Sequence, residues 1–241
     1  MHAPSDHDLD PRTGQPVGFA VDAVPAQPPQ PLAFTGRHGR VERLDPARHG
    51  NALWEAVEGH PALLTYMAFG PFAERAAFSD WLASRRESAD PYFYAIVDPA
   101  GHAVGLAALM SIRPDMRVVE VGNILLSPRL QRTALATEAQ YLLARYAFET
   151  LRYRRYEWKC DALNAASRRA ALRLGFRYEG TFRDHMIIKG RSRDTAWFAM
   201  LAADWPARRA AFERWLAPDN FDAGGAQRQP LGDNRSLLSA G

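Results

Sequence analysis

The sequence predicts an α/β fold in which a mixed sheet carries helices on both of its faces. The first observation is a group of short strand-like segments in the first half of the chain. The second is a β-α-β-α-β-β alternation of apolar periods in the second half. Helices that separate strands favour parallel neighbours, whereas strands joined by short turns favour antiparallel ones, so both kinds of pairing are expected in one sheet.

The first half of the chain predicts four strands and two helices. The strands are expected at 40–44, 92–97, 103–111 and 118–126, and the helices at 45–59 and from about 71 to 82. Asp45 is a good N-cap and Pro46 suits the first helical position. The turn at 98–101 contains Pro and Gly and separates two strands, which indicates an antiparallel pair.

The second half contains the clearest helix of the chain. Apolar residues recur at helical spacing from 134 to 151, at Leu135, Ala139, Leu142, Leu143, Tyr146 and Ala147. A strand at 153–161, a helix at 164–174, two hairpin strands at 176–188 and 194–201, and a helix at 204–217 complete the series. Gly175 follows the second of these helices and is a good left-handed C-cap.

Composition shifts divide the chain into four parts. Residues 1–33 contain seven prolines and no sustained apolar period, so we expect a disordered leader. Residues 34–202 are expected to form one domain, and 203–217 an amphipathic helix packed on it. The stretch 218–241 is rich in Gly, Asp, Asn, Gln and Ser and predicts a flexible tail.

Charge and cysteine content exclude several kinds of protein. The chain has 30 basic and 27 acidic side chains, a net charge of +3, which is too small to predict a nucleic-acid partner without clustering. The single cysteine, Cys160, excludes an intrachain disulfide and a cysteine-based zinc cluster, and we expect no metal. The polar N-terminus lacks the apolar core of a secretory signal, and no run is long enough to cross a membrane. We therefore expect a cytoplasmic protein.

The segment 125–139 carries the main chemical signal. An apolar strand ends, a short loop follows, and a long helix begins, so unpaired N–H groups and the helix dipole favour an anion there. Small residues at Ala134 and Ala136 allow a ligand to approach the backbone, and Arg129 and Arg132 add positive charge. These features predict a pyrophosphate cradle. The alternative is that the small residues only pack the helix on the sheet.

Further motifs follow in order after this segment. Gln131 to Ala136 matches a Gln/Arg-x-x-Gly-x-Gly/Ala pattern, except that Ala134 replaces the first glycine, and Ala136 to Ala139 reads Ala-Thr-Glu-Ala. Asn164 and Ser167 form Asn-x-x-Ser, and 174–176 reads Leu-Gly-Phe. With these motifs, roughly residues 36–202 resemble the GNAT (Gcn5-related) N-acetyltransferases, and within them the ribosomal-protein N-terminal acetyltransferase (RimJ/RimL-type) branch.

This resemblance implies a fold, a substrate and a reaction. The fold is a mostly antiparallel six- to seven-stranded sheet whose parallel central strands splay apart. The co-substrate is acetyl-CoA, which an amine, either a small molecule or a protein N-terminus, attacks directly in a ternary complex. The expected cofactor contacts are Asn123, Ile124, Leu125, Leu126, Gln131, Arg132, Thr133, Ala134, Leu135, Ala136, Thr137, Asn164 and Ser167. The alternative is a non-catalytic acyl-CoA-binding or protein-interaction module on the same fold.

Three residues are candidates for proton transfer. By resemblance, Glu120 is the general base; otherwise it is a strand-surface carboxylate paired with an arginine. Ser167 is the candidate that protonates the departing thiolate; otherwise it caps a helix or binds the cofactor arm. His185 titrates in the useful range and is a second base candidate, or a structural strand histidine.

The acceptor pocket is expected beside the first two helices. The aromatic stretch 60–72 and the hairpin 185–197 are candidate walls, although core packing is the alternative for most of the aromatic residues. Neither segment contains a concentrated acidic cluster, which argues against a polycationic acceptor. The leader and the last helix offer extra surface, which makes a homodimer compatible with the sequence.

Overall fold

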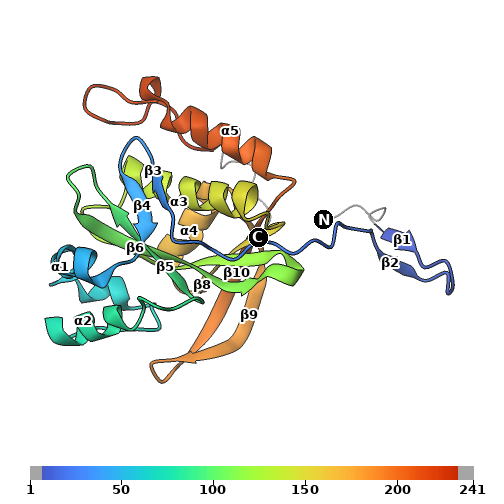
Figure 1. Cartoon of the computed structure of the whole chain (residues 1–241), viewed down its shortest axis with the longest axis horizontal. Helices are drawn as coiled ribbons and strands as arrows, with labels where there is room; N and C mark the ends of the chain where they lie inside the picture. The colour runs from blue at the N-terminus through green and yellow to red at the C-terminus, as the bar shows by residue number, and fades with distance from the viewer. Residues whose placement is uncertain (1–6, 233–241) are drawn as a thin grey trace.

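The computed structural model of the chain describes residues 7–232, which build one large sheet with helices on both faces and a small separate hairpin (Figure 1). The strands are β1 His7–Leu9, β2 Pro16–Gly18, β3 Ala33–Thr35, β4 Arg40–Arg43, β5 Tyr92–Val97, β6 Ala103–Arg113, β7 Val118–Leu126, β8 Arg155–Asp161, β9 Arg177–Ile188 and β10 Arg191–Leu201. The helices are α1 Pro46–Val57, α2 Arg75–Ala83, α3 Ala134–Arg145, α4 Ala165–Leu174 and α5 Trp205–Leu216. Short helical turns lie at η1 Pro61–Leu64, η2 Pro114–Met116, η3 Tyr146–Thr150 and η4 Pro218–Asn220.

The large sheet has the order β3-β4-β5-β6-β7-β8-β10-β9. All neighbouring strands are antiparallel except β7 and β8, which run parallel. This pair brackets α3, the long crossover helix that a parallel connection requires. The expected fold class is confirmed. The sheet has eight strands, one more than the six or seven expected, because Ala33–Thr35 pairs with β4 as an edge strand.

Edge strand β3 is supported by a contact from a residue about 100 positions later in the sequence. The buried carboxylate of Glu138, on α3, accepts the N–H groups of Arg37 at 2.6 Å and His38 at 2.8 Å in the β3–β4 loop. Gly36 lies so close to this carboxylate that a Cβ atom would overlap it. The strand therefore forms through tertiary contact, which a three-residue segment after a proline-rich stretch does not reveal in the sequence.

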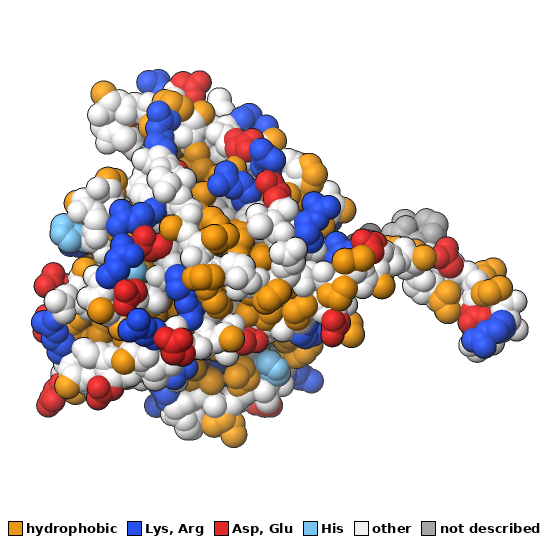
Figure 2. All heavy atoms as spheres, viewed as in Figure 1, with side chains coloured by type: hydrophobic (Ala, Val, Ile, Leu, Met, Phe, Trp, Pro, Cys, Tyr) orange, Lys and Arg blue, Asp and Glu red, His pale blue; other side chains and the backbone are white. Residues whose placement is uncertain are grey.

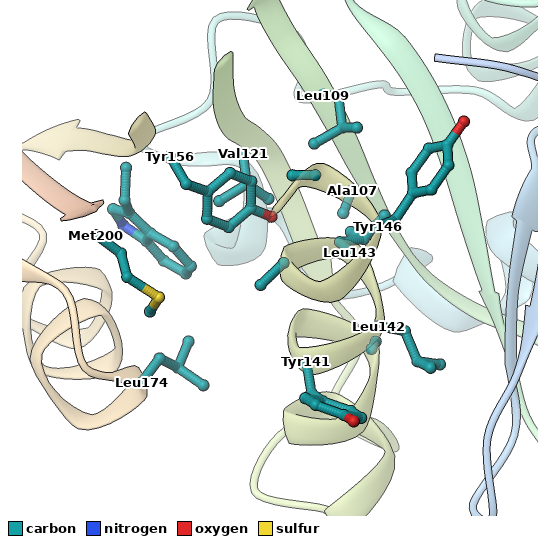
Figure 3. Packing of buried hydrophobic residues seen from close by; sticks show 14 of the residues in the cluster. Ala107, Leu109, Val121, Tyr141, Leu142, Leu143, Tyr146, Tyr156, Leu174 and Met200 are labelled. Carbon is teal, nitrogen blue, oxygen red and sulfur yellow. The ribbon is translucent and has the colours of Figure 1, made fainter. Parts of the chain in front are cut away.

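The helices cover the two faces of the sheet separately. Buried side chains of α3, α4 and α5 pack with one face, where Val121, Tyr156 and Met200 meet α3 and α4 (Figure 3). Buried residues of α1 and α2, including Trp54 and Phe78, pack with Leu106 and Leu125 on the other face. Of the aromatic stretch 60–72, Phe69 and Phe72 pack against this second core, as the packing alternative proposed, whereas Tyr66 is exposed.

The long helix predicted at 134–151 is present in two parts. Regular α3 ends at Arg145, and a π-helical turn at Tyr146–Thr150 continues it. Thr133 is the N-cap, and its side chain accepts the N–H of Ala136. Asn164 and Gly175 cap α4 at its two ends, as expected.

The chain ends contact the domain more than their composition suggests. Ala26 is buried, and the N–H groups of Gln27 and Gln30 donate to Leu151 O at 2.9 Å and Tyr146 Oη at 2.8 Å. These contacts lie inside the segment 1–33, for which the sequence predicts disorder, and they combine backbone donors with one small buried side chain. At the other end, Leu231 is buried against the core. Residues 1–6 and 233–241 of the predicted leader and tail lie outside the described residues.

Candidate functional site

A fork in the centre of the sheet is the most distinctive feature of the fold. Strands β7 and β8 pair only from Val118–Arg155 to Glu120–Glu157. Beyond that point the described part of the chain has no further pairing between them, although β7 continues to Leu126. The other edge of β7 stays paired with β6 as far as Leu126 opposite Gly105. One row of β7 backbone groups therefore faces a gap, where a peptide-like ligand can satisfy it.

A β-bulge lies on β7 just beyond the fork point. Asn123 and Ile124 together oppose one residue of β6, between the pairs Ala108–Gly122 and Leu106–Leu125. Asn123 has a φ of 49°, in the left-handed region that asparagine tolerates better than most residues. Such a bulge turns the strand locally and re-aims its polar groups. The side chain of Leu125 points into the core under α1 and α2, so only its backbone is available to a ligand.

The loop after β7 leads into the first turn of α3. Gln131 Nε2 donates to Leu126 O at 3.0 Å and Thr133 Oγ1 donates to Leu130 O at 2.7 Å, which fix the loop against the strand end. Ala134 is the first helical residue and is not among the left-handed positions, so alanine replaces the motif glycine without backbone strain. The N–H groups of Arg132, Ala134 and Leu135 have no acceptor within residues 7–232.

A cavity of about 300 Å³ opens beside these free N–H groups. Its lining includes His38, Asp98, Arg129, Thr133 and Ala134. Arg129 is exposed, and its Nη2 atom lies 3.8 Å from Asp98 Oδ2. Together with the helix dipole, the N–H groups and the arginine make this corner favourable for an anion. The side chain of Leu135 is buried, so this residue offers only its backbone N–H to the cavity, and the Thr137 hydroxyl is occupied because it accepts from Arg173 at 3.0 Å.

The opposite side of the fork is formed by the end of β8 and the start of α4. Asn164 Oδ1 accepts the N–H of Ser167 at 3.0 Å, which fixes both motif residues. Ser167 Oγ accepts from Trp158 Nε1 at 3.0 Å, so its own hydroxyl hydrogen remains available for donation. Burial raises the pKa of the nearby Cys160 thiol, which fits a packed thiol rather than a nucleophile.

Glu120 is the last β7 residue paired with β8, and it is buried. Its Oε2 atom lies 3.0 Å from Lys159 Nζ and accepts the Ser111 hydroxyl at 3.1 Å. Burial raises the pKa of Glu120, and the ammonium and hydroxyl oppose that rise only in part. The Glu120 carboxylate is therefore buried rather than on the strand surface, and its ionic partner is a lysine of the neighbouring strand rather than an arginine.

Lys159 joins several charged and aromatic groups. Its Nζ atom also lies 3.0 Å from Glu157 Oε2 and 4.0 Å from the centre of the Trp197 ring, a cation–π contact. Burial tends to raise the pKa of Glu157, but hydrogen bonds from Arg155 and Lys159 outweigh it, and the pKa is lowered. Lys159 thus bridges two carboxylates that face each other at the fork.

His185 lies on edge strand β9. Strands β8 and β10 separate β9 from β7, which carries Glu120. Its Nδ1 atom is 3.0 Å from Thr195 Oγ1, and its ring lies beside Trp197 with centres 5.9 Å apart. Trp197 and Lys159 stand between His185 and Glu120. The structure therefore does not bring the two base candidates into direct contact.

One hydrogen bond connects the two predicted acceptor walls, and another joins the first wall to the β8–α4 loop. Tyr66 Oη donates to Leu163 O at 3.3 Å, between the segment after η1 and the β8–α4 loop. Lys189, at the tip of the β9–β10 hairpin, donates to Leu64 O at 2.8 Å. A second cavity of about 200 Å³, whose lining includes Trp54, Pro61, Leu64 and Phe72, lies behind this segment.

Comparison with known proteins agrees with this geometry. The family described as the acetyltransferase (GNAT) domain matches residues 43–177. The chain belongs to the GNAT acetyltransferase family. A crystal structure of a GCN5-related N-acetyltransferase from Brucella melitensis is 45% identical, with a TM-score of 0.86 over 89% of this chain and 98% of that one.

Two further GNAT relatives differ more from this chain. A structure described as a probable acetyltransferase of the GNAT family from Chromobacterium violaceum ATCC 12472 is 36% identical, with a TM-score of 0.73 over 80% of this chain and 99% of that one. A Bacillus subtilis (strain 168) protein named "Putative ribosomal N-acetyltransferase YdaF" is 27% identical over 109 residues. That match covers 45% of this chain and 59% of the relative, so it spans less than two thirds of the curated protein.

This GNAT chain has site residues that the sequence did not reveal as a group. Lys159, Glu157, Trp197 and Ser111 all adjoin Glu120 or its ion pair. Period-two alternation already places Glu157 and Lys159 on one face of a strand, but which strand lies beside them is decided by the crossover through α3. Across residues 7–232 no group of three His, Cys, Asp or Glu is arranged to hold a metal ion. The described helices include none long and apolar enough to span a membrane.

Proposed function

We propose that this GNAT protein is an acetyl-CoA-dependent N-acetyltransferase that acts on a primary amine. The observation that carries the proposal is the fork, with an unpaired β7 edge that ends at a helix N-terminus with free N–H groups. A diphosphate at the start of α3 and an amide-containing arm along residues 123–126 would use these two sets of groups together. Asn164 and Ser167, at the start of α4 after β8, are the further contacts that we propose for this arm.

The transfer is a direct displacement at the thioester carbon. The nitrogen lone pair of the acceptor forms a bond to the acetyl carbon, the carbon–sulfur bond breaks, and the pair of electrons leaves on the CoA sulfur. A backbone N–H at the bulge would polarise the acetyl carbonyl. The Ser167 hydroxyl would supply a proton to the thiolate, whose pKa of about 8.5 by analogy with cysteine makes this help useful but not obligatory.

Glu120 would receive the proton that the acceptor amine loses. Within residues 7–232 its Oε1 accepts no hydrogen bond, whereas Oε2 is occupied by Lys159 and Ser111. Because the carboxyl is buried, proton transfer through a water molecule fits better than direct contact. Lys159 acts as a positioning residue that holds the Glu120 carboxylate at the fork. His185 remains a second, more distant candidate.

A protein N-terminus places a smaller demand on this base than a lysine-like alkyl amine does. An α-amino group with a pKa of about 7.8 is about one-seventh unprotonated at pH 7, against about 0.04% for an amine with a pKa of 10.4. The name of the Bacillus subtilis relative also refers to a ribosomal acceptor. A small-molecule amine is the other acceptor class that the proposal admits.

Calorimetry and a thiol-release assay on the full chain test this function. We expect saturable acetyl-CoA binding, and release of free CoA when an alkyl amine or a peptide with a free N-terminus is added. Peptides with blocked N-termini are the matched controls. Binding without thiol release over the whole panel would favour the non-catalytic CoA-binding module, and no binding at all would overturn both assignments.

A further inference from the structure

Residues 7–21 form an arm that projects from the body of the protein (Figures 1 and 2). Within it, β1 and β2 pair only with each other, as a separate two-stranded sheet. Exposed apolar side chains run along the arm and its base, with exposures of 63% at Leu9, 40% at Val17, 55% at Phe19, 50% at Val21 and 66% at Val24. A two-stranded hairpin by itself is at best marginally stable in water, so this arm needs a surface to pack on.

The base of the arm is fixed to the domain. Arg117 Nη1 donates to Asp22 O at 3.1 Å, and the N–H of the buried Ala26 donates to Pro114 O at 3.1 Å. No hydrogen bond joins residues 7–21 to the rest of the described chain beyond residue 24. The anchor therefore directs the arm outward, and its apolar residues stay in solvent in a single molecule.

The same chain has a second uncovered surface on edge strand β9. This strand of 12 residues pairs with β10 on one side and has no strand on the other among residues 7–232. We call its exposed apolar residues the β9 edge surface: Tyr178 at 45%, Phe182 at 52%, Met186 at 40% and Ile187 at 81% exposed. A long apolar edge strand of this kind offers both backbone hydrogen bonds and apolar contact to another strand.

The two surfaces carry opposite charge. Residues 7–22 contain three aspartates and one arginine, whereas 177–193 contain five basic and two acidic side chains. Some of these basic groups are already paired, such as Arg177 with Asp204. Arg183 and Arg191 are exposed, and neither has an acidic partner among the described residues. An acidic arm beside these arginines would gain attraction and orientation.

We propose that the arm of one chain packs along the β9 edge surface of a second copy of this protein. A reciprocal exchange gives a closed two-fold dimer in which each chain contributes one arm and accepts one. Both uncovered apolar surfaces are then buried by one contact, and the charges match. This proposal does not depend on the proposed acetyl transfer, since its readout is mass.

The test measures the molar mass of the full chain by light scattering in a dilution series. The measured molar mass of the wild type is expected to be twice that of one chain. Phe19→Glu in the arm and Ile187→Glu on β9 should each raise the dimer dissociation constant by at least about tenfold. Leu163→Glu, at a position that is 78% exposed but outside both surfaces, is the matched control and should leave the dimer intact.

Mixing the two interface variants makes the test specific for arm-to-β9 pairing. The Ile187→Glu chain keeps a normal arm and the Phe19→Glu chain keeps a normal β9, so the mixture should recover dimers that neither variant forms alone. A monomeric wild type, which would leave the arm to another partner, overturns the proposal. A dimer that resists both substitutions, or a mixture that recovers nothing, overturns it as well.

Discussion

The Oε2 atom of Glu120 on β7 and the Nζ atom of Lys159 on β8 lie 3.0 Å apart, at the point where the two parallel strands separate. Glu157, opposite Glu120 in the register, is held by the same ammonium at 3.0 Å. Like charges that face each other across a strand pair are destabilising, and the Lys159 ammonium between the two carboxylates offsets that repulsion. One lysine at the point where the sheet opens thus holds the carboxylate proposed as the base.

Replacing Lys159 with methionine should damage both stability and activity. Loss of one partner from a buried ion pair costs about 3–5 kcal/mol of unfolding free energy, which denaturant titration measures. Without the ammonium the pKa of Glu120 should rise further, so the acid limb of the pH–rate profile should move to higher pH. Lys159→Arg keeps the charge and should keep most of that limb in place. An unshifted limb in a folded Lys159→Met protein would contradict the positioning role.

Glu120→Gln should reduce turnover with little effect on acetyl-CoA affinity. A base works only when ionised, and burial raises the pKa of this one, so its contribution begins above that raised value. At high pH the acceptor is already unprotonated and needs no base. The defect, about 10²–10⁴-fold, should therefore be largest at the lower end of the active pH range and shrink as pH rises. Identical pH–rate profiles for variant and wild type would remove Glu120 from the mechanism.

Ala136→Asp should abolish acetyl-CoA binding. The substitution puts a bulky negative group in the first turn of α3, beside the N–H groups proposed to hold a diphosphate. Ala207→Asp makes the same change in the first turn of α5, where the position is exposed, and should bind acetyl-CoA like the wild type. Calorimetry compares the two, with circular dichroism to show that both are folded. Full binding by the Ala136 variant would refute the cradle.

Glu138→Ala should destabilise the protein by about 2–4 kcal/mol. The substitution leaves two backbone N–H groups of the β3–β4 loop without their charged acceptor and opens a space next to Gly36. Denaturant unfolding measures the loss, and hydrogen exchange at Arg37 and His38 locates it. Glu213→Ala, on the exposed side of α5, should cost much less. A loss at Glu138 no larger than at Glu213 would show that β3 does not depend on this contact.

Local patterns in the sequence predicted most of the elements and both motif-bearing turns. Helical spacing and capping at Thr133, Asn164 and Gly175 act over a few residues, so these features can be read along the chain. The same range limits what could be foreseen. Strand β3 escaped prediction because a carboxylate 100 residues away holds its loop, and the π-helical end of α3 has no clear local signal.

The sequence by itself determined the fold class and the family, because periodicity and motif order can be read along the chain without knowing which residues meet in space. It also named Glu120, but not what surrounds it. Only the tertiary structure decided that Lys159 reaches Glu120, that Trp197 separates His185 from it, and that the β7 edge lies open beyond them. The physical reason is that these relations join β7, β8, β10 and β9, and which strands lie side by side is fixed by the packing of the whole sheet.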